Sequence, residues 1–181
     1  MLRVMLFSLL YFGFIPRIAS EKFDSGEPRI QKLYDLIRES KYGIHDLSRI
    51  KAQKKGDLYR LNMPFELGLD IGCREFGEKT DKHHLILETK RYRYQAALSD
   101  LANSDIMAHN DDESTLVKCI RRWFASNGFR KLQSPTIVWY DFQNFMADFY
   151  NDRKSAGFSD DDIYDLPIPE YVDDIRDWLK K

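Results

Sequence analysis

Cysteine and histidine are scarce in this sequence, and the few present lack the spacing of metal-binding motifs. Cys73 and Cys119 are the two cysteines, too few and too far apart for a disulfide framework, and neither belongs to a C-x-x-C pair. The four histidines do not form an H-E-x-x-H motif. We therefore expect no metal site and no thioredoxin-type redox chemistry.

An excess of charge of either sign is also missing. The chain carries 28 Lys and Arg against 29 Asp and Glu, a formal net charge of −1. This balance gives no reason to expect a nucleic-acid partner. The phosphate-binding patterns G-x-x-x-x-G-K-[ST] and G-x-G-x-x-G do not occur, nor does G-x-S-x-G. ATPase, Rossmann dehydrogenase and α/β-hydrolase assignments therefore lose their usual support.

The sequence has no hydrophobic run of membrane-spanning length. Residues 1–14 read MLRVMLFSLLYFGF, fewer than the about 20 apolar residues that a span needs. The segment has the pattern of a signal peptide, with Ile-Ala-Ser at 18–20 as a cleavage site. The alternative is a buried helix over residues 2–12 followed by a strand over 13–19. The pattern further along favours this alternative, so we expect a cytoplasmic protein without membrane contact; a secreted helical protein is the competing interpretation.

What the sequence does contain is the composition of an ordinary globular protein. Hydrophobic residues make up 43% of the 181 residues and charged residues 31%. A chain of this length buries roughly 70% of its unfolded surface and needs no disulfides. Aromatic residues are frequent, at 14%, and we expect most of them in packing. No repeat or low-complexity segment divides the chain.

Helical and strand patterns alternate along the chain. The predicted strands cover residues 13–19, 42–48, 82–88 and 104–109, and the predicted helices cover residues 2–12, 29–40, 62–71, 112–124, 135–150 and 172–179. Alternation of this kind predicts an α/β fold with a mostly parallel sheet. In such sheets ligands bind beyond the carboxyl ends of the strands. Side chains that follow the predicted strands are therefore the first candidates for a site.

Residues 44–49, Ile-His-Asp-Leu-Ser-Arg, are the most unusual of these segments. They place His45, Asp46, Ser48 and Arg49 at the end of a predicted strand. Asp46 can accept hydrogen bonds from ribose hydroxyls, and Ser48 and Arg49 can bind a phosphate. The alternative is structural: Asp46 and Ser48 cap a loop, and Arg49 pairs at the surface.

Residues 62–68, Asn-Met-Pro-Phe-Glu-Leu-Gly, form the second candidate segment, which opens a predicted helix. Asn62 can cap this helix, Pro64 lies in its first turn, and Met63 borders the same edge. Glu66 would face the cleft, where a carboxylate can stabilise an oxocarbenium-like transition state or attack the anomeric carbon. The alternative is that Glu66 serves only as a helix-capping residue.

Three further candidates follow later predicted strands. Asp100 and His109 lie where side chains would border the cleft, although Asp100 also fits a turn cap and His109 a structural hydrogen bond. Residues 90–95, Lys-Arg-Tyr-Arg-Tyr-Gln, mix cations with aromatics. They fit stacking on a base or phosphate binding, or a solvated loop.

The order of these segments resembles the TIR-like and nucleoside 2-deoxyribosyltransferase-like superfamily, including stand-alone bacterial TIR-like proteins of unknown function. The resemblance rests on the IHDLSR and NMPFELG segments and spans about residues 1–125. It implies a flavodoxin-like three-layer sandwich and cleavage of the N-glycosidic bond of NAD, a nucleotide or a nucleoside. Glu66 matches the catalytic glutamate, and Asp46 and Ser48 match the ligand contacts. NAD would then be a substrate, so no cofactor is expected.

One feature of that family has no counterpart in the pattern. The family begins with a strand, whereas this sequence begins within a predicted helix, so the first strand is expected to be missing or truncated unless residues 1–7 form it. A misassigned start, a truncated chain or a partner that completes the sheet would explain this. We expect an α/β nucleotide-binding domain over residues 1–126 and extra C-terminal helices over 127–181, packed on the same domain or used in self-association.

Two functions of different class follow. The first is an N-glycosidase in which Glu66 is the nucleophile or electrostatic stabiliser, while Asp46, Ser48 and Arg49 orient ribose and phosphate. The second is a nucleotide sensor or protein-interaction module without catalysis, acting in bacterial signalling or defence.

Overall fold

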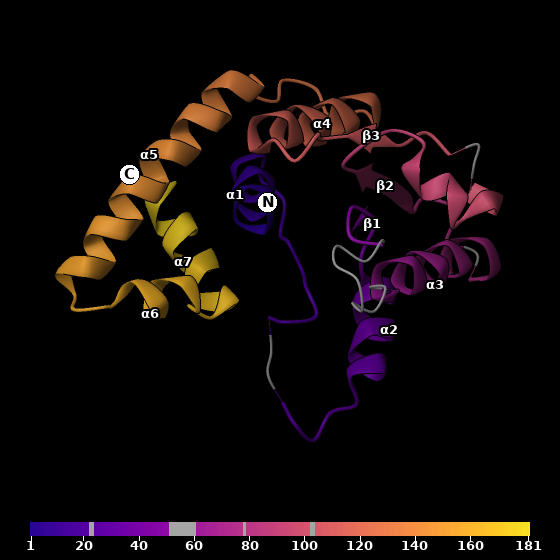
Figure 1. The fold of residues 1–181 in the computed structure, drawn as a ribbon, viewed down its shortest axis with the longest axis horizontal. Helices are drawn as coiled ribbons and strands as arrows, with labels where there is room; N and C mark the ends of the chain where they lie inside the picture. The colour runs from indigo at the N-terminus through magenta and orange to yellow at the C-terminus, as the bar shows by residue number, and fades with distance from the viewer. Residues whose placement is uncertain (22–23, 51–60, 78, 102–103) are drawn as a thin grey trace. The chain divides into compact units, whose positions relative to one another are not determined.

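The structure is a computed structural model that describes residues 1–21, 24–50, 61–77, 79–101 and 104–181. The chain divides into two compact units. The α/β unit is Asp24–Asp112, and the helical unit combines Met1–Phe23 with Glu113–Lys181. Figure 1 shows the elements of both. The predicted domain boundary after residue 126 stays a prediction.

A parallel three-stranded sheet forms the centre of the α/β unit. The strands are β1 (Tyr42–Asp46), β2 (His83–Glu88) and β3 (Met107–Ala108), in the order β1-β2-β3. The helices of this unit are α2 (Arg29–Glu39), α3 (Asn62–Phe76) and the short 3-10 helices η1 (Arg93–Ala96) and η2 (Ser99–Leu101). The carboxyl ends of all three strands therefore lie at one edge of the sheet, where the α/β fold places its ligands.

The strand register decides which side chains share a face. Gly43 pairs with His84, and His45 pairs with Ile86. Because side chains alternate along a strand, these four positions lie on one face of the sheet, and Asp46 lies on the other.

Helix α3 covers the His45 face. The apolar core there consists of Leu47, Ile50, Leu67, Ile86 and Tyr94, with partly buried neighbours Met63, Ile71, Leu98, Leu101 and Ile106. The Tyr94 hydroxyl donates a 2.9 Å hydrogen bond to the Leu101 carbonyl, so η1 and η2 are fixed to each other. Helix α2 packs against α3. This packing gives α3 one defined orientation over β1.

The expected α/β class with a parallel sheet is confirmed. The strands follow chain order, as in one half of a flavodoxin-like sheet. Two local expectations are wrong. Residues 13–19 form no strand, and the strand expected over 104–109 is reduced to β3. Residues Leu2–Tyr11 are helical, as expected, and so supply no first strand to the sheet.

Aromatic rings fill the core of the helical unit. Its helices are α1 (Leu2–Tyr11), α4 (Glu113–Ser126), α5 (Pro135–Ser155), α6 (Asp160–Tyr164) and α7 (Ile168–Trp178). Phe145 of α5 is 1% exposed. Its ring centroid lies 5.4 Å from that of Phe7, 5.7 Å from that of Tyr171 and 6.0 Å from that of Trp178. Phe145 therefore joins α1, α5 and α7, which accounts for much of the high aromatic content.

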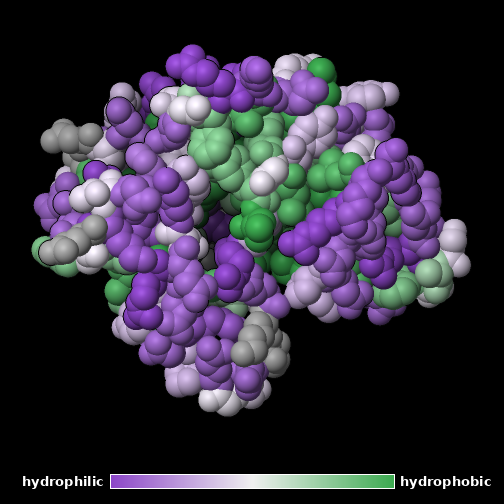
Figure 2. All heavy atoms as spheres, turned by 180° about the vertical axis from the view of Figure 1, so that it is seen from behind, coloured by the Kyte–Doolittle hydropathy of each residue, from purple (hydrophilic) through white to green (hydrophobic). Residues whose placement is uncertain are grey.

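Local signals explain where these helices begin. Ser134 caps α5 by accepting the backbone N–H of Ile137, and Pro135 is the first residue of the helix. Helix α6, which was not expected, starts with a capping box between Ser159 and Asp162. Hydrophilic residues dominate the surface over the C-terminal helices, at the right of Figure 2. Among the described residues, no helix combines the length and apolar character needed to cross a membrane.

Replacement of Phe145 by alanine tests the aromatic core. Phe145→Ala should lower the free energy of unfolding by about 3–5 kcal/mol, because it opens a cavity among the four rings that pack on Phe145, those of Phe7, Phe149, Tyr171 and Trp178. Tyr140→Ala on the same helix is the control, since Tyr140 is 63% exposed. Urea denaturation followed by circular dichroism measures both. Equal losses in the two variants would contradict this account of the core.

Candidate functional site

The carboxyl edge of the sheet brings together three of the predicted residues. Asp46 ends β1, Ser48 follows it, and His109 follows β3. The Ser48 hydroxyl donates a 2.5 Å hydrogen bond to Asp46 Oδ1 and lies 2.8 Å from His109 Nε2. The Ser48 backbone N–H also donates to Asp46 Oδ1, at 3.0 Å. These contacts show that Asp46, Ser48 and His109 lie together at one edge of the sheet, as the sequence predicted.

The hydrogen bonds of His109 define its tautomer. His109 is 1% exposed, and its Nδ1 accepts the backbone N–H of Asp111 at 3.1 Å. The neutral ring therefore carries its hydrogen on Nε2, which points it at Ser48 Oγ. The Ser48 hydroxyl hydrogen is in turn directed at Asp46. In this arrangement His109 donates to Ser48 and cannot take its proton, so the three residues do not form an activated serine nucleophile.

Asp46 is held in its ionised form. Burial raises the pKa of its carboxyl, but the hydrogen bonds with His109 and with the Ser48 side chain and backbone outweigh burial and leave the pKa below its ordinary value. Since its Oδ1 already accepts both Ser48 bonds, the carboxylate has fewer free positions for a ligand than the sequence suggested.

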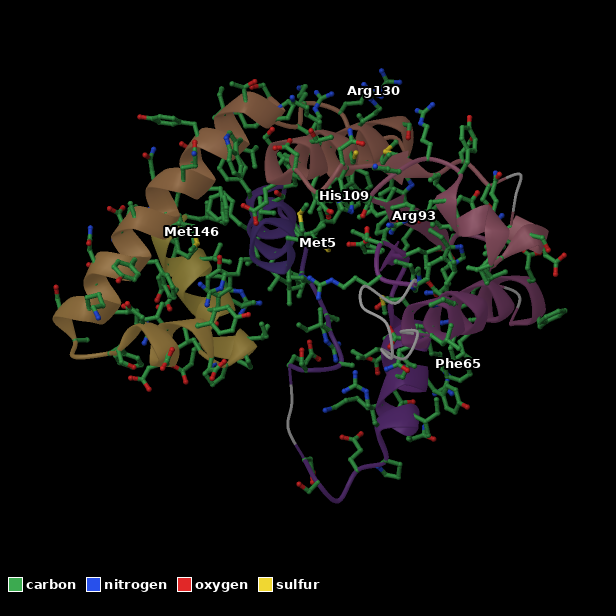
Figure 3. All side chains as sticks on the ribbon, in the orientation of Figure 1. Met5, Phe65, Arg93, His109, Arg130 and Met146 are labelled. Atoms are coloured by element: carbon green, nitrogen blue, oxygen red, sulfur yellow. The ribbon has the colours of Figure 1, made fainter. Side chains whose placement is uncertain are left out.

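A buried ion pair completes this edge of the sheet. Glu88 ends β2 and is fully buried, and its two carboxylate oxygens accept Arg93 at 2.7 and 3.1 Å. The same guanidinium donates to the Ser48 carbonyl. Arg93 and His109 are labelled in Figure 3 and both contact Ser48. Arg93 thus fixes the segment after β1 to the end of β2. Within the 90–95 segment, the Arg93 side chain is therefore engaged by protein groups, those of Glu88 and Ser48.

A second polar cluster lies on the His45 face, beneath α3. Its centre is the carboxylate of Asp70, which is 2% exposed. Asp70 Oδ2 lies 2.8 Å from His45 Nε2 and 3.3 Å from His84 Nε2, and Oδ1 lies 2.8 Å from Lys82 Nζ. We call Asp70, His45, His84 and Lys82 the Asp70 cluster. Three potential cations around one buried carboxylate stabilise its charge.

Lys82 joins this cluster to the end of α2. It is 1% exposed, and its ammonium donates to the carbonyls of Ile37, at 2.7 Å, and Ser40. These carbonyls belong to the last turn and the cap of α2 and have no partner within the helix. A cation at this end of a helix is favourable.

The space for Asp70 depends on Gly43. A Cβ atom at position 43 would lie 1.9 Å from Asp70 Oδ2 and 2.9 Å from His45 Nε2. Glycine is therefore required in β1 at the point where α3 places its carboxylate. A Cβ atom at Gly68, in contrast, would have no atom within 4 Å.

Asp70 is strongly acidic. Burial raises its pKa, but the contacts with His45, His84 and Lys82 outweigh it and hold the pKa far below the ordinary value for aspartate. The cluster is therefore built around a permanent negative charge.

Glu66 lies one helical turn before Asp70, on the same face of α3. Asp70 lies against Gly43, near the start of β1, whereas Leu67 and Met63, which come earlier in α3, pack in the core with Leu47, just after β1. Helix α3 therefore runs antiparallel to β1. A helical turn of about 5.4 Å matches a two-residue step along a strand. Because Asp70 lies over Gly43, this step brings Glu66 over His45.

Electrostatics agree with this placement. Burial raises the pKa of Glu66 above its ordinary value, partly offset by the charges of His45 and Arg29. Glu66 is the fifth residue of α3, beyond the first turn, so the capping alternative is wrong. A half-buried carboxyl with a raised pKa is a common feature of acid–base sites.

The predicted site residues thus separate into two groups. Asp46, Ser48 and His109 meet at the strand edge, whereas His45 joins Glu66 on the opposite face of β1. The remaining candidates are peripheral: Arg49 and Asp100 are exposed, Met63 packs on the core, Pro64 is the third residue of α3, and Asn62 is its exposed first residue. Leu61 occupies the cap position, so the expected Asn62 cap is wrong.

Sequence reasoning missed Asp70, Lys82 and His84, and it did not predict that Glu88 and Arg93 pair with each other. A signal for Asp70 was present, because it lies four residues after Glu66 on an otherwise apolar helix face. Lys82 and His84 gave no such signal, since a lysine before a strand and a pair of adjacent histidines usually lie at the surface. Their burial follows from tertiary packing.

Within the described part of the chain, no group of three or more His, Cys, Asp or Glu side chains is arranged to hold a metal ion. Comparison with protein-family models, with curated proteins and with solved structures finds no significant match. The geometry of the site and the resemblance of the two sequence segments are therefore the two indications of function.

Alanine substitutions of two glycines test the packing around Asp70. Gly43→Ala should lower the free energy of unfolding by about 3 kcal/mol, because the new methyl group displaces a buried carboxylate. Gly68→Ala should raise it by about 1 kcal/mol, because alanine favours the helix and meets open space. Thermal and urea denaturation measure both changes. A Gly43→Ala variant as stable as wild type would show that Asp70 does not lie against β1.

The pH dependence of stability tests the charge of Asp70. Because its folded pKa lies below the unfolded value of about 3.9, its stabilisation is complete above that pH and is lost as pH falls. Asp70→Asn should therefore be less stable at pH 7 and should lose less stability between pH 5 and 3. Asp81→Asn is the control, since that side chain is 73% exposed. Wild type and Asp70→Asn with the same pH slope would contradict the assignment.

Proposed function

We propose that the chain binds a nucleotide or nucleoside at the carboxyl edge of its sheet and cleaves the N-glycosidic bond through Glu66. The observation that carries the proposal is the state of Glu66, a half-buried carboxyl with a raised pKa beside His45 and Arg29. Such a group can act on a glycosidic bond as nucleophile or electrostatic stabiliser. The resemblance of residues 44–49 and 62–68 to the TIR-like superfamily points the same way.

In this proposal, residues at the carboxyl edge of the sheet bind the ribose and the phosphate of the ligand. Asp46 is ionised there and accepts hydrogen bonds, as a ribose hydroxyl would require. Arg49 is exposed and can pair with a phosphate.

A binding module without catalysis is the second candidate. It is favoured by one observation: Asp46 and Glu66 lie on opposite faces of the sheet, as the strand alternation requires. A nucleotide held by Asp46 and Ser48 alone would then not reach Glu66. Such a module would be stabilised by nucleotides without forming a product.

Base release by wild type and Glu66→Gln tests the proposal. Each protein is incubated with NAD, nucleoside monophosphates and deoxynucleosides, and free base is measured by mass spectrometry. Wild type should release a base, and Glu66→Gln should release it at least about 100-fold more slowly. Glu75→Gln is the matched control, an exposed glutamate near the end of the same helix. Stabilisation by a nucleotide with no base released would favour the binding module; equal release by wild type and Glu66→Gln would remove Glu66 from the reaction.

A further inference from the structure

The second nitrogen of His45 has no partner. His45 is 6% exposed, and its Nε2 is committed to Asp70 at 2.8 Å. Its Nδ1 is buried and makes no hydrogen bond to any described residue. A buried polar atom without a partner is rare in folded proteins and calls for a partner that the resting arrangement does not show.

Asp70 determines what kind of partner Nδ1 needs. An ionised carboxylate only accepts hydrogen bonds, so His45 carries a hydrogen on Nε2 and donates it to Asp70. In the neutral ring Nδ1 then holds a lone pair and needs a donor. Lys82 is already bound to the end of α2 and to Asp70, and the Nε2 of His84 lies 3.3 Å from Asp70 Oδ2.

The protonated carboxyl of Glu66 can donate the hydrogen bond that His45 Nδ1 needs. It lies one helical turn before Asp70, is partly exposed, and is influenced by the charge of His45. Arg29 is the other charged group that acts on it. His84 approaches the same Asp70 oxygen as His45, at 3.3 Å. Asp70 thus contacts His45 directly, and the charge of His45 acts on Glu66 one helical turn away.

We propose that Glu66 and His45 share one proton, and that Glu66 delivers it to a nucleoside base that leaves only when protonated. This inference rests on the proposed function and assigns Glu66 the role of acid instead of nucleophile. His45 is a positioning residue that acts through Glu66. The substrate class is a nucleoside or nucleotide with a neutral purine or pyrimidine base, not a pyridinium nucleotide, whose base leaves without a proton.

The proposed step balances with one water molecule. The C1′–N bond breaks, its electron pair goes to the base, and the Glu66 proton goes to the base. A water oxygen bonds to C1′, and the proton that this water loses returns to the Glu66–His45 pair. The products are a free base and a free sugar, and the protein ends in its starting protonation state.

Carboxyl titration tests the shared proton without requiring activity. The Glu66 side chain is followed by ¹³C NMR between pH 3 and 9 in wild type, His45→Gln and His84→Gln. His84→Gln is the matched control. His84 contacts Asp70 as His45 does, but in the sheet it lies beside Gly43, two residues before His45 along β1. The Glu66 midpoint should rise by about one pH unit in His45→Gln and stay unchanged in His84→Gln. Equal midpoints in wild type and His45→Gln would overturn the shared proton.

A second measurement covers the case in which His45→Gln fails to fold. Imidazole ¹⁵N spectra of the wild type should show His45 Nδ1 changing at the same pH midpoint as the Glu66 carboxyl. Separate, independent midpoints would overturn the proposal.

Two probe substrates test the substrate class. Wild type should release hypoxanthine from inosine at least ten-fold faster than nicotinamide from nicotinamide mononucleotide, with a rate that falls as pH rises through the Glu66 midpoint. Faster nicotinamide release would overturn the acid role while leaving the glycosidase proposal intact. If Glu66 and His45 titrate together but neither probe releases its base, the proposed cleavage and its substrate class are overturned. The shared proton would then stand by itself.

Discussion

The buried carboxylate of Asp70 is the interaction on which the α/β unit depends. It joins four elements at one point: α3 supplies the carboxylate, β1 the open position at Gly43 and the ring of His45, β2 the ring of His84, and Lys82 the link to α2. Isolated charges in the interior are costly, so each member requires the others. This mutual dependence fixes the position of α3 over the sheet. It thereby also fixes the position of Glu66, one helical turn before Asp70.

The cluster also explains how a site can form on the His45 face. Helix α3 is anchored near its middle by the buried Asp70–Lys82 ion pair, which holds its first turns at a set distance from the strand. Functional groups carried by such a helix are better positioned than groups on a free loop. The strand edge beyond it is fixed separately, by the Glu88–Arg93 pair and by the hydrogen bonds among Asp46, Ser48 and His109. The hydrogen bonds among Asp46, Ser48 and His109 lie on the face of β1 opposite the Asp70 cluster, whereas Glu88, two residues after Ile86, lies on the His45 face.

Local pattern predicted the fold class well, because apolar periodicity and helix-start residues act within a few positions. Helices α2, α3, α4 and α5 and strands β1 and β2 lie where that pattern placed them. The joint location of Asp46, Ser48 and His109 followed from the rule for parallel strands. The separation of His45 from Asp46 was readable from strand alternation, but the partners of His45 were not, because Asp70, His84 and Lys82 come from distant positions. Only tertiary packing decides which buried charges meet.

A crystal structure of the Glu66→Gln variant with bound inosine tests the central claim most directly. The substitution removes the carboxyl proton donor and keeps the side-chain size, so the substrate should stay intact. The account predicts that the base and the glycosidic bond lie beside position 66 on the His45 face of β1, with the sugar extending toward the carboxyl edge of the sheet. A ligand held by Asp46 and Ser48 with its glycosidic bond away from position 66 would contradict the account.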